Sequence, residues 1–420
     1  MILRGSDSPA LEPPAGQQGP KLHALGRARF DRSYRAVEAF FTAQADVVPA
    51  ACWAMARRFH GGGRLLAWGA GAAASDAWHV AVEFVHPVIV GKRALPALVL
   101  EEEPAVRLSL LGRPTDIALA ISPEGDDPHG AALLSQARRQ GLLTIALNGR
   151  GAGDAGADYR FAIEDDDPTV VQEVQETLYH VLWELVHVFL EQPGLLEEPG
   201  EGRSVSHGLE SLLYPFLGSE PADPAPVLAD VRASTLRKAA DVVALRAALW
   251  ERHASDLAAA ARLLSAAFLA GRKVLAFGNG GSATDAQDLV SDLVAPPVAG
   301  WRPLPALDLT RDTAVLTAIG NDVGFENVFS RQVIALGEPG DVAVGFSTSG
   351  ESASVLAGLE RARVRGLRTL GFSGSGGGRM AAAGLDLCIV APSSYVPRIQ
   401  EAHATACHTI LYLLHALLDA

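Results

Sequence analysis

The sequence KVLAFGNGGSATDAQD at residues 273–288, with its counterpart RLLAWGAGAAASDAWH at residues 64–79, decides the fold of this 420-residue chain. Each stretch has an apolar run, a glycine-rich turn and then a Ser-Asp or Thr-Asp pair at the start of a helical pattern. A turn of this kind joins a buried strand to a helix in open α/β sheets. The two copies are 209 residues apart, which indicates an internal repeat.

Two further pairs of segments extend the repeat. TDIALAISPEG at 115–125 matches GDVAVGFSTSG at 340–350, and VVQEVQETLYH at 170–180 matches RIQEAHATACH at 398–408. Short apolar runs that alternate with helical periods predict βαβ units. The predicted fold class is α/β, with two doubly wound parallel-sheet domains of flavodoxin-like sandwich type in tandem, flanked by helices.

The composition of the linking segments suggests where the domains begin and end. Residues 1–22 are rich in Pro and Gly and are expected to form a disordered lead-in. The first, degenerate domain is expected at 23–190 and the second domain at 227–420. Residues 191–226, rich in Pro, Gly and Glu, are expected to be a linker, although their segment LESLLYPFL could dock on a domain.

Charge and cysteine content narrow the functional classes. The chain carries 35 Lys and Arg against 48 Asp and Glu, a net charge of −13, which disfavours nucleic acid as a partner. No apolar run reaches the length of a membrane span. Three cysteines without a CxxC pair are typical of a reducing compartment, so a cytoplasmic protein is expected.

Two glycine-rich or serine-rich turns could bind an anion. FGNGGSATDAQ at 277–287 follows a strand and opens a helix, whose first N–H groups are free to bind phosphate. STSGES at 347–352 adds hydroxyl and backbone donors after another apolar strand. Either turn alone could be an ordinary βα connection, but the carboxyl ends of parallel strands lie at one sheet edge, where such folds bind ligands.

Polar side chains at helical spacing form two candidate metal or acid–base sets, one in each half. The first half has a His and a Glu at i, i+4 and a remote Gln and His, a set that suits zinc: His79, Glu83, Gln172 and His180. The second half has two acids in place of the His and Glu, as an alternative set: Asp288, Asp292, Gln400 and His408. Paired acids on a helix are often merely solvated, and a single His is often structural.

At this point the sequence resembles a known family. GNGGSATDAQ, TAIGNDVGFENVFSRQ at 317–332, STSGES and RIQEAH together resemble the phosphoheptose isomerases of the sugar isomerase (SIS) domain superfamily, over residues 230–420. The resemblance implies that phosphate binds the serine loop and that the sugar lies along the glycine turn and an Asn-Asp pair. The implied substrate-binding residues are Asn279, Gly280, Gly281, Ser282, Asn321, Asp322, Ser347, Thr348, Ser349, Ser352 and Gln400.

The two halves depart from the family pattern in complementary ways. Asp288 and Asp292 stand where the resemblance implies a His and a Glu in the second half. The first half keeps the metal-type residues, but Glu124 and Asp127 stand where Ser349 and Ser352 do, and carboxylates there would repel phosphate.

The resemblance implies an aldose–ketose isomerase that converts sedoheptulose 7-phosphate into D-glycero-D-manno-heptose 7-phosphate with a divalent metal, zinc by expectation. The site is either self-contained, with Asp292 and His408 as catalytic residues, or composite, with Glu83 and His180. A homodimer that presents four SIS domains is the expected assembly. The alternative is a non-catalytic SIS protein that binds a sugar phosphate as a sensor or a protein partner as an adaptor.

Overall fold

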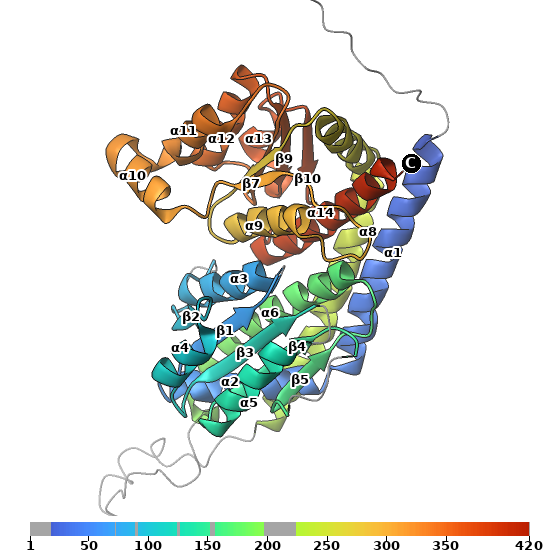
Figure 1. Cartoon of the computed structure of the whole chain (residues 1–420). Coiled ribbons are helices and arrows are strands. Elements are labelled where there is room, and N and C mark those ends of the chain that lie inside the picture. The colour runs from blue at the N-terminus through green and yellow to red at the C-terminus, as the bar shows by residue number, and fades with distance from the viewer. Residues whose placement is uncertain are drawn as a thin grey trace, which may run out of the picture.

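The computed structural model describes residues 18–71, 73–88, 91–123, 127–151, 156–196 and 224–419. It contains two five-stranded sheets with the same strand order, β2-β1-β3-β4-β5 in the first half and β7-β6-β8-β9-β10 in the second (Figure 1). All described strand pairs are parallel. The strands are β1 (Leu65–Gly69), β2 (Ala97–Val99), β3 (Ile117–Ser122), β4 (Leu143–Asn148), β5 (Tyr159–Ala162), β6 (Val274–Phe277), β7 (Ala306–Asp308), β8 (Val342–Ser347), β9 (Arg368–Ser373) and β10 (Leu387–Val390). The predicted α/β fold class, with two domains in tandem, is confirmed.

The central strands are apolar along their whole length because helices cover both faces of each sheet. Every residue of β3 (IALAIS) and of β8 (VAVGFS) is buried. Such continuous apolar runs are typical of parallel strands buried on two faces. The strand-to-helix turns therefore fall at the carboxyl edge of each sheet.

The helices of the first half are α1 (Gln18–Ala43), α2 (Val47–His60), α3 (Ala73–Val85), α4 (Pro104–Leu111), α5 (Pro128–Arg139) and α6 (Pro168–Leu190), with a 3-10 turn η1 (Pro193–Leu195). Those of the second half are α8 (Ala225–Leu269), α9 (Gly281–Val294), α10 (Thr313–Val323), α11 (Val328–Leu336), α12 (Ala353–Val364), α13 (Gly378–Ala381) and α14 (Val396–Leu418), with 3-10 turns η2 (Phe325–Asn327) and η3 (Ser375–Gly377). The start of helix α6 illustrates how the sequence fixes where a helix begins. Pro168 begins α6 and Asp167 caps it by accepting a hydrogen bond from the backbone N–H of Thr169.

Helices α1 and α8 run side by side along both halves (Figure 1). Each helix packs one of its ends in the hydrophobic core of the first half and the other end in the core of the second half. In the first part of α1, Leu22 and Phe30 are buried in the core of the second half, whereas Phe41, near its end, is buried in the core of the first. Helix α8 does the reverse, with Val242 in the first core and Leu264 in the second. Burial on both sides holds the two halves together as one body.

This exchange bears on the expected domain boundaries. Helix α1 begins at Gln18, inside the expected lead-in of 1–22, because Leu22 is already buried in the second core. The early part of α8 packs in the first core although it belongs to the range 227–420. Residues 1–17 and 197–223, which include the segment LESLLYPFL, lie outside the described residues, so the linker over 191–226 stays a prediction.

Two long helices, α6 and α14, lie between the sheets and are buried over nearly their whole length. Beside them, α3 of the first half packs against α9 of the second (Figure 1). These four helices carry both predicted metal or acid–base sets, so the fold brings the two sets together at the junction. No helix in the described part of the chain is both long and apolar enough to cross a membrane.

Candidate active site at the junction of the two halves

A small cavity of about 20 Å³ lies where α3, α6, α9 and α14 meet. A space of this size holds one water molecule or one metal ion. Both halves contribute lining residues: Ser75, Asp76, His79, Gln172, Glu176 and Tyr179 from the first, and Thr284, Asp285, Asp288, Ala404, Cys407 and His408 from the second. Two members of each predicted set therefore border this cavity, His79 and Gln172 from the first and Asp288 and His408 from the second.

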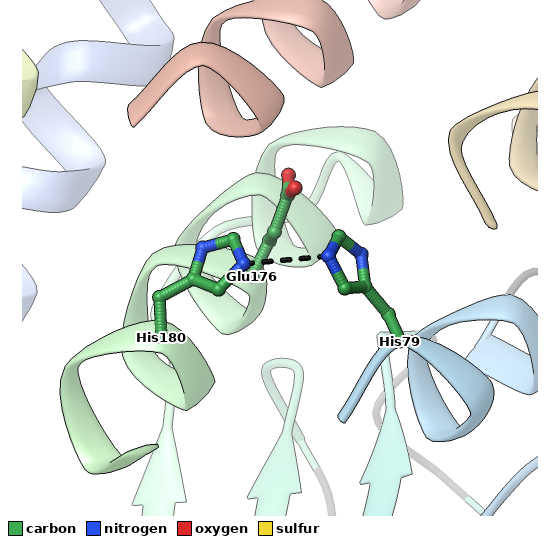
Figure 2. A group of neighbouring side chains, drawn as sticks. All are labelled: His79, Glu176 and His180. Carbon is green, nitrogen blue, oxygen red and sulfur yellow. Dashed lines mark hydrogen bonds between the residues drawn. The ribbon is translucent and has the colours of Figure 1, made fainter. Parts of the chain in front are cut away.

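The two histidines of the first half point their Nε2 atoms at each other across a distance of 3.4 Å (Figure 2). The Nδ1 atom of each ring is held from behind, that of His79 by the hydroxyl of Tyr179 at 3.1 Å and that of His180 by Glu401 at 3.0 Å. Partners of this kind fix the ring orientation of metal-binding histidines. Burial lowers the pKa of both rings, which favours the neutral form that binds metal.

Glu176 joins this pair, although it was not among the site residues predicted from the sequence. Its carboxylate and the two imidazoles offer ligand atoms within 4.8 Å of one another. Figure 2 shows that Glu176 and His180 come from α6 and His79 from α3. Glu176 precedes His180 by four residues on α6, so helical spacing would have been the signal to find it.

Glu83 lies at the rim of the same group. Its Oε1 atom is 4.0 Å from Nε2 of His79, and its Oε2 atom has no hydrogen-bond partner. Burial, and then the nearby Asp285, raise the pKa of Glu83 to about 8. A carboxyl group with a pKa near neutrality and a free oxygen is suited to taking up and returning a proton.

The glutamines are exchanged between the two predicted sets. Gln172 of the first half donates hydrogen bonds to Asp76, at 3.0 Å, and to Asp288 of the second half, at 2.6 Å. Gln400 of the second half instead contacts His79 of the first. The expected grouping of each Gln with the His and Glu of its own half therefore differs from the structure, because α6 and α14 lie between the sheets and face the opposite half.

In the second half, His408 faces two aspartates. Its Nε2 atom lies 3.5 Å from Oδ2 of Asp288 and 3.4 Å from Oδ2 of Asp292, while its Nδ1 atom donates to Glu173 of the first half at 3.0 Å. Burial alone would lower the pKa of His408, but the three carboxylates raise it well above its usual range. Burial and the neighbouring Asp288 raise the pKa of Asp292 to about 6.

The two glutamates that hold the histidines are themselves neutralised by arginines. Glu173 is paired with Arg29 at 2.5 Å and with Arg246 at 3.7 Å, and Glu401 is paired with Arg398. Burial would raise the pKa of both glutamates, but these cations lower it, so both are ionised. The other buried carboxyls of the junction have raised pKa values: Asp76, Glu83, Glu176, Asp285 and Asp292.

The predicted phosphate loop is formed in the second half. It follows β8, and Asn279 of the glycine turn donates to Ser352 at 2.7 Å and to Ser354 at 2.9 Å, which joins the two turns. The Oγ atoms of Ser347 and Ser349 lie 3.5 Å apart. The backbone carbonyl of Thr348 accepts a hydrogen bond from the backbone N–H of Gly374. Ser282 is buried at the start of α9.

Gly281 connects the phosphate loop to the first-half histidines. A Cβ atom at this position would overlap Nε2 of Gln400 and would lie 3.0 Å from Nε2 of His79. Its neighbour Gly280 has a φ of 57°, a conformation that favours glycine. The glycine turn of one half therefore touches the His79 group of the other.

The counterpart loop in the first half follows β3. Residues 124–126, including Glu124, lie outside the described residues. Asp127, at the position of Ser352, caps α5 by accepting a hydrogen bond from Gly130 at 2.9 Å. The first-half loop therefore has a helix-capping carboxylate at the position where the second-half loop has the hydroxyl of Ser352.

The expected Asn-Asp pair does not join the site. Asn321 and Asp322 are exposed on α10 and are hydrogen-bonded to each other at 2.9 Å. Helix α10 buries none of its residues and projects from the body of the chain (Figure 1). In the described part of the chain α10 packs mainly against α11 and η2, so the assignment of these two residues to the sugar site stays a prediction.

The fold and the site together define a class of proteins. The SIS domain family matches residues 239–374. In fold, the whole chain is similar to the C-terminal domain of glucosamine-fructose-6-phosphate aminotransferase from Francisella tularensis, with a TM-score of 0.61 and 11% identity over 96% of this chain and 98% of that one.

Sequence comparison narrows the class to one family. The chain is 48% identical to a phosphoheptose isomerase from Rhodospirillum rubrum over 38% of this chain and 85% of the relative. It is 45% identical to one from Aquifex aeolicus over 43% of this chain and 93% of the relative. The chain belongs to the phosphoheptose isomerase family. It is an aldose–ketose isomerase.

Proposed function

We propose that the protein interconverts sedoheptulose 7-phosphate and D-glycero-D-manno-heptose 7-phosphate at a composite site. The serine loop of the second half binds the phosphate, and the acid–base groups come from the first half. The closeness of Gly281 to His79 of the first half supports this proposal, because Gly281 belongs to the glycine turn that Asn279 joins to the serine loop.

The reaction moves one proton between C1 and C2 of the open-chain sugar. Glu83 takes the proton from the carbon next to the carbonyl, which gives an enediol, and returns it to the neighbouring carbon. His180 assists the proton transfer between the two oxygens. The free Oε2 atom of Glu83 and its pKa of about 8 suit this exchange near neutral pH.

The residues of the first half fit a divalent metal, and we propose zinc. His79, His180 and Glu176 offer three ligand atoms within 4.8 Å, and both imidazoles are oriented from behind. Gln400 is placed to add an amide ligand. The chemistry that such a metal supplies is polarisation of the sugar oxygens.

Several wider proposals follow from the family and the repeat. The equal strand orders support an origin of the two halves by tandem duplication, with domains at 23–190 and 227–420. We propose a cytoplasmic homodimer with four SIS domains, in which a second copy could cover the exposed helix α10 and bring Asn321 and Asp322 to a site.

The test is turnover of sedoheptulose 7-phosphate by the purified full chain, with and without a chelator. Formation of the heptose 7-phosphate that stops on chelation and returns with zinc is the expected result. If the sugar phosphate raises the melting temperature but is not converted, the isomerase acts on another sugar phosphate, and the proposed reaction is wrong.

A further inference from the structure

A row of buried charged side chains joins helices α6 and α14 and continues away from His180. It consists of His180 and Glu184 on α6 and of Arg398 and Glu401 on α14. We propose that Glu184 is a positioning residue of the isomerase site, which acts through Arg398 and Glu401 to hold the ring of His180. The functional part of this inference rests on the proposed role of His180 in the reaction.

The contacts along the row alternate in charge. Glu401 accepts a hydrogen bond from Nδ1 of His180 at 3.0 Å and is paired with Arg398, three residues earlier on α14. The Nη2 atom of Arg398 lies 3.5 Å from Oε1 of Glu184. Because Glu184 follows His180 by four residues, both side chains lie on one face of α6, and the row ends on the helix from which it started.

Glu184 is itself held from the other side. Its Oε1 atom accepts a hydrogen bond from the hydroxyl of Tyr395, at the start of α14, at 2.8 Å. Its Oε2 atom is paired with Lys238 of α8. Three residues of the second half therefore converge on one carboxylate of the first, so this carboxylate can fix where the guanidinium of Arg398 lies.

The row is almost closed to water. His180 and Glu401 are fully buried, and Glu184 and Arg398 are 7% and 6% exposed. Burial would raise the pKa of Glu401, but Arg398 and then His180 lower it, so Glu401 is ionised and Nδ1 of His180 carries the shared proton. Charges in such surroundings are weakly screened, so removal of one charge is felt by the next group in the row.

The internal repeat provides a comparison, because the row occurs on one side only. In the alignment of 170–180 with 398–408, Val170 stands at the position of Arg398. The same alignment, continued, places Tyr412 at the position of Glu184. A valine and a tyrosine cannot form this ion pair, and the other histidine–glutamate pair of the junction takes its arginines from α1 and α8. A change at Glu184 is therefore expected to reach His180 selectively.

The first measurement needs neither a metal nor a sugar phosphate. The full chain, labelled with ¹⁵N at histidine and freed of metal, is expected to give an NMR signal from the buried Nδ1–H of His180, which H180N identifies. E184Q is expected to shift or lose this signal. The matched control is E191Q, because Glu191 ends the same helix in a surface ion pair with Lys92. E191Q is expected to keep the wild-type signal.

Turnover then tests whether Glu184 acts through Glu401. E184Q is expected to lower kcat about tenfold with KM unchanged, because the serine loop that binds the phosphate is not touched. In the E401Q background the same change is expected to have no further effect, since the connection is already cut. E184D, which keeps the charge, is expected to recover most of the lost kcat.

If E184Q does not fold, Y395F carries the same expectation in weaker form, because it removes one donor that holds Glu184. A wild-type His180 signal in these variants, or an equal loss of kcat with and without Glu401, would overturn the proposal. A shifted His180 signal in E184Q, in a protein whose wild type converts no sedoheptulose 7-phosphate, would contradict the proposed function and leave the positioning role of Glu184 in place.

Discussion

The Nδ1 atom of His408, in the second half, donates a hydrogen bond to Oε1 of Glu173, in the first half, at 3.0 Å. The same relationship runs in the opposite direction between His180 and Glu401, also at 3.0 Å. Each half thus orients the histidine of the other. The site is a property of the junction, so neither half is expected to hold a complete set on its own.

This reciprocity makes the two glutamates a matched pair. We expect E401Q to weaken zinc binding about 10-fold to 100-fold, because His180 loses the carboxylate that orients it. E173Q is expected to leave zinc binding unchanged, because Glu173 orients the other histidine. Zinc per chain, measured by elemental analysis on folded protein, checks this, and equal zinc loss in both variants would contradict it.

The phosphate loop allows a second matched comparison. Ser347 ends β8 in the intact loop, and Ser122 ends β3 at the counterpart position of the first half. S347A is expected to raise KM for the sugar phosphate about tenfold with little change in kcat, since it removes a phosphate donor. S122A is expected to leave KM unchanged. A rise in KM for S122A as large as that for S347A would place phosphate binding elsewhere.

Gly281 offers a test of the contact between the halves. G281A would force a Cβ atom into the side chain of Gln400, and overpacking of this kind costs about 1–3 kcal/mol. We expect a lower melting temperature and at least a tenfold loss of kcat.

The control for this change is Gly19, near the start of α1, where a Cβ atom would meet nothing within 4 Å. G19A is expected to leave both the melting temperature and kcat within error of the wild type. Wild-type kcat in G281A would show that the approach of Gln400 to the glycine turn is unimportant.

The pKa of Glu83 predicts how the stability of the metal-free protein depends on pH. In the folded state Glu83 keeps its proton up to about pH 8, whereas in the unfolded chain it ionises near its ordinary value of 4.5. Between these values the folded state binds more protons, so the free energy of unfolding falls as the pH rises, by at most about 1.4 kcal/mol per pH unit for one group.

Chemical denaturation in the presence of chelator, from pH 5 to pH 8, measures this slope. E83Q is expected to make this slope less steep by the part that Glu83 contributes, since the other buried carboxyls of the junction also have raised pKa values. E38Q, at an exposed glutamate of α1, is expected to leave the slope as in the wild type. An unchanged slope in E83Q would mean that Glu83 does not hold a proton in the folded state.

Much of the fold was predictable from local pattern. The apolar runs that become β3 and β8, and the glycine turn before α9, are recognisable because strand and turn chemistry are local. The sharing of α1 and α8 between the two cores was not predictable, since an amphipathic helix does not show which sheet it covers.

The candidate site was predictable in its residue types but not in its grouping. His79 and His180 come together as expected. Gln172 and Gln400 change places because the direction in which α6 and α14 face depends on how the halves dock. Glu176 could have been found from its i, i+4 spacing to His180 on the same helix. Asn321 and Asp322 lie apart on the exposed helix α10, and the sequence does not show where that helix packs.

The most direct test of the composite site is the kcat of E83Q beside that of D292N, with sedoheptulose 7-phosphate as substrate and both variants confirmed to be folded. The composite site predicts that E83Q loses about 10²-fold to 10⁴-fold in kcat, as expected for removal of an acid–base group, and that D292N loses less than about tenfold. Loss of turnover in D292N with wild-type turnover in E83Q would place the chemistry in the second half alone and contradict the account.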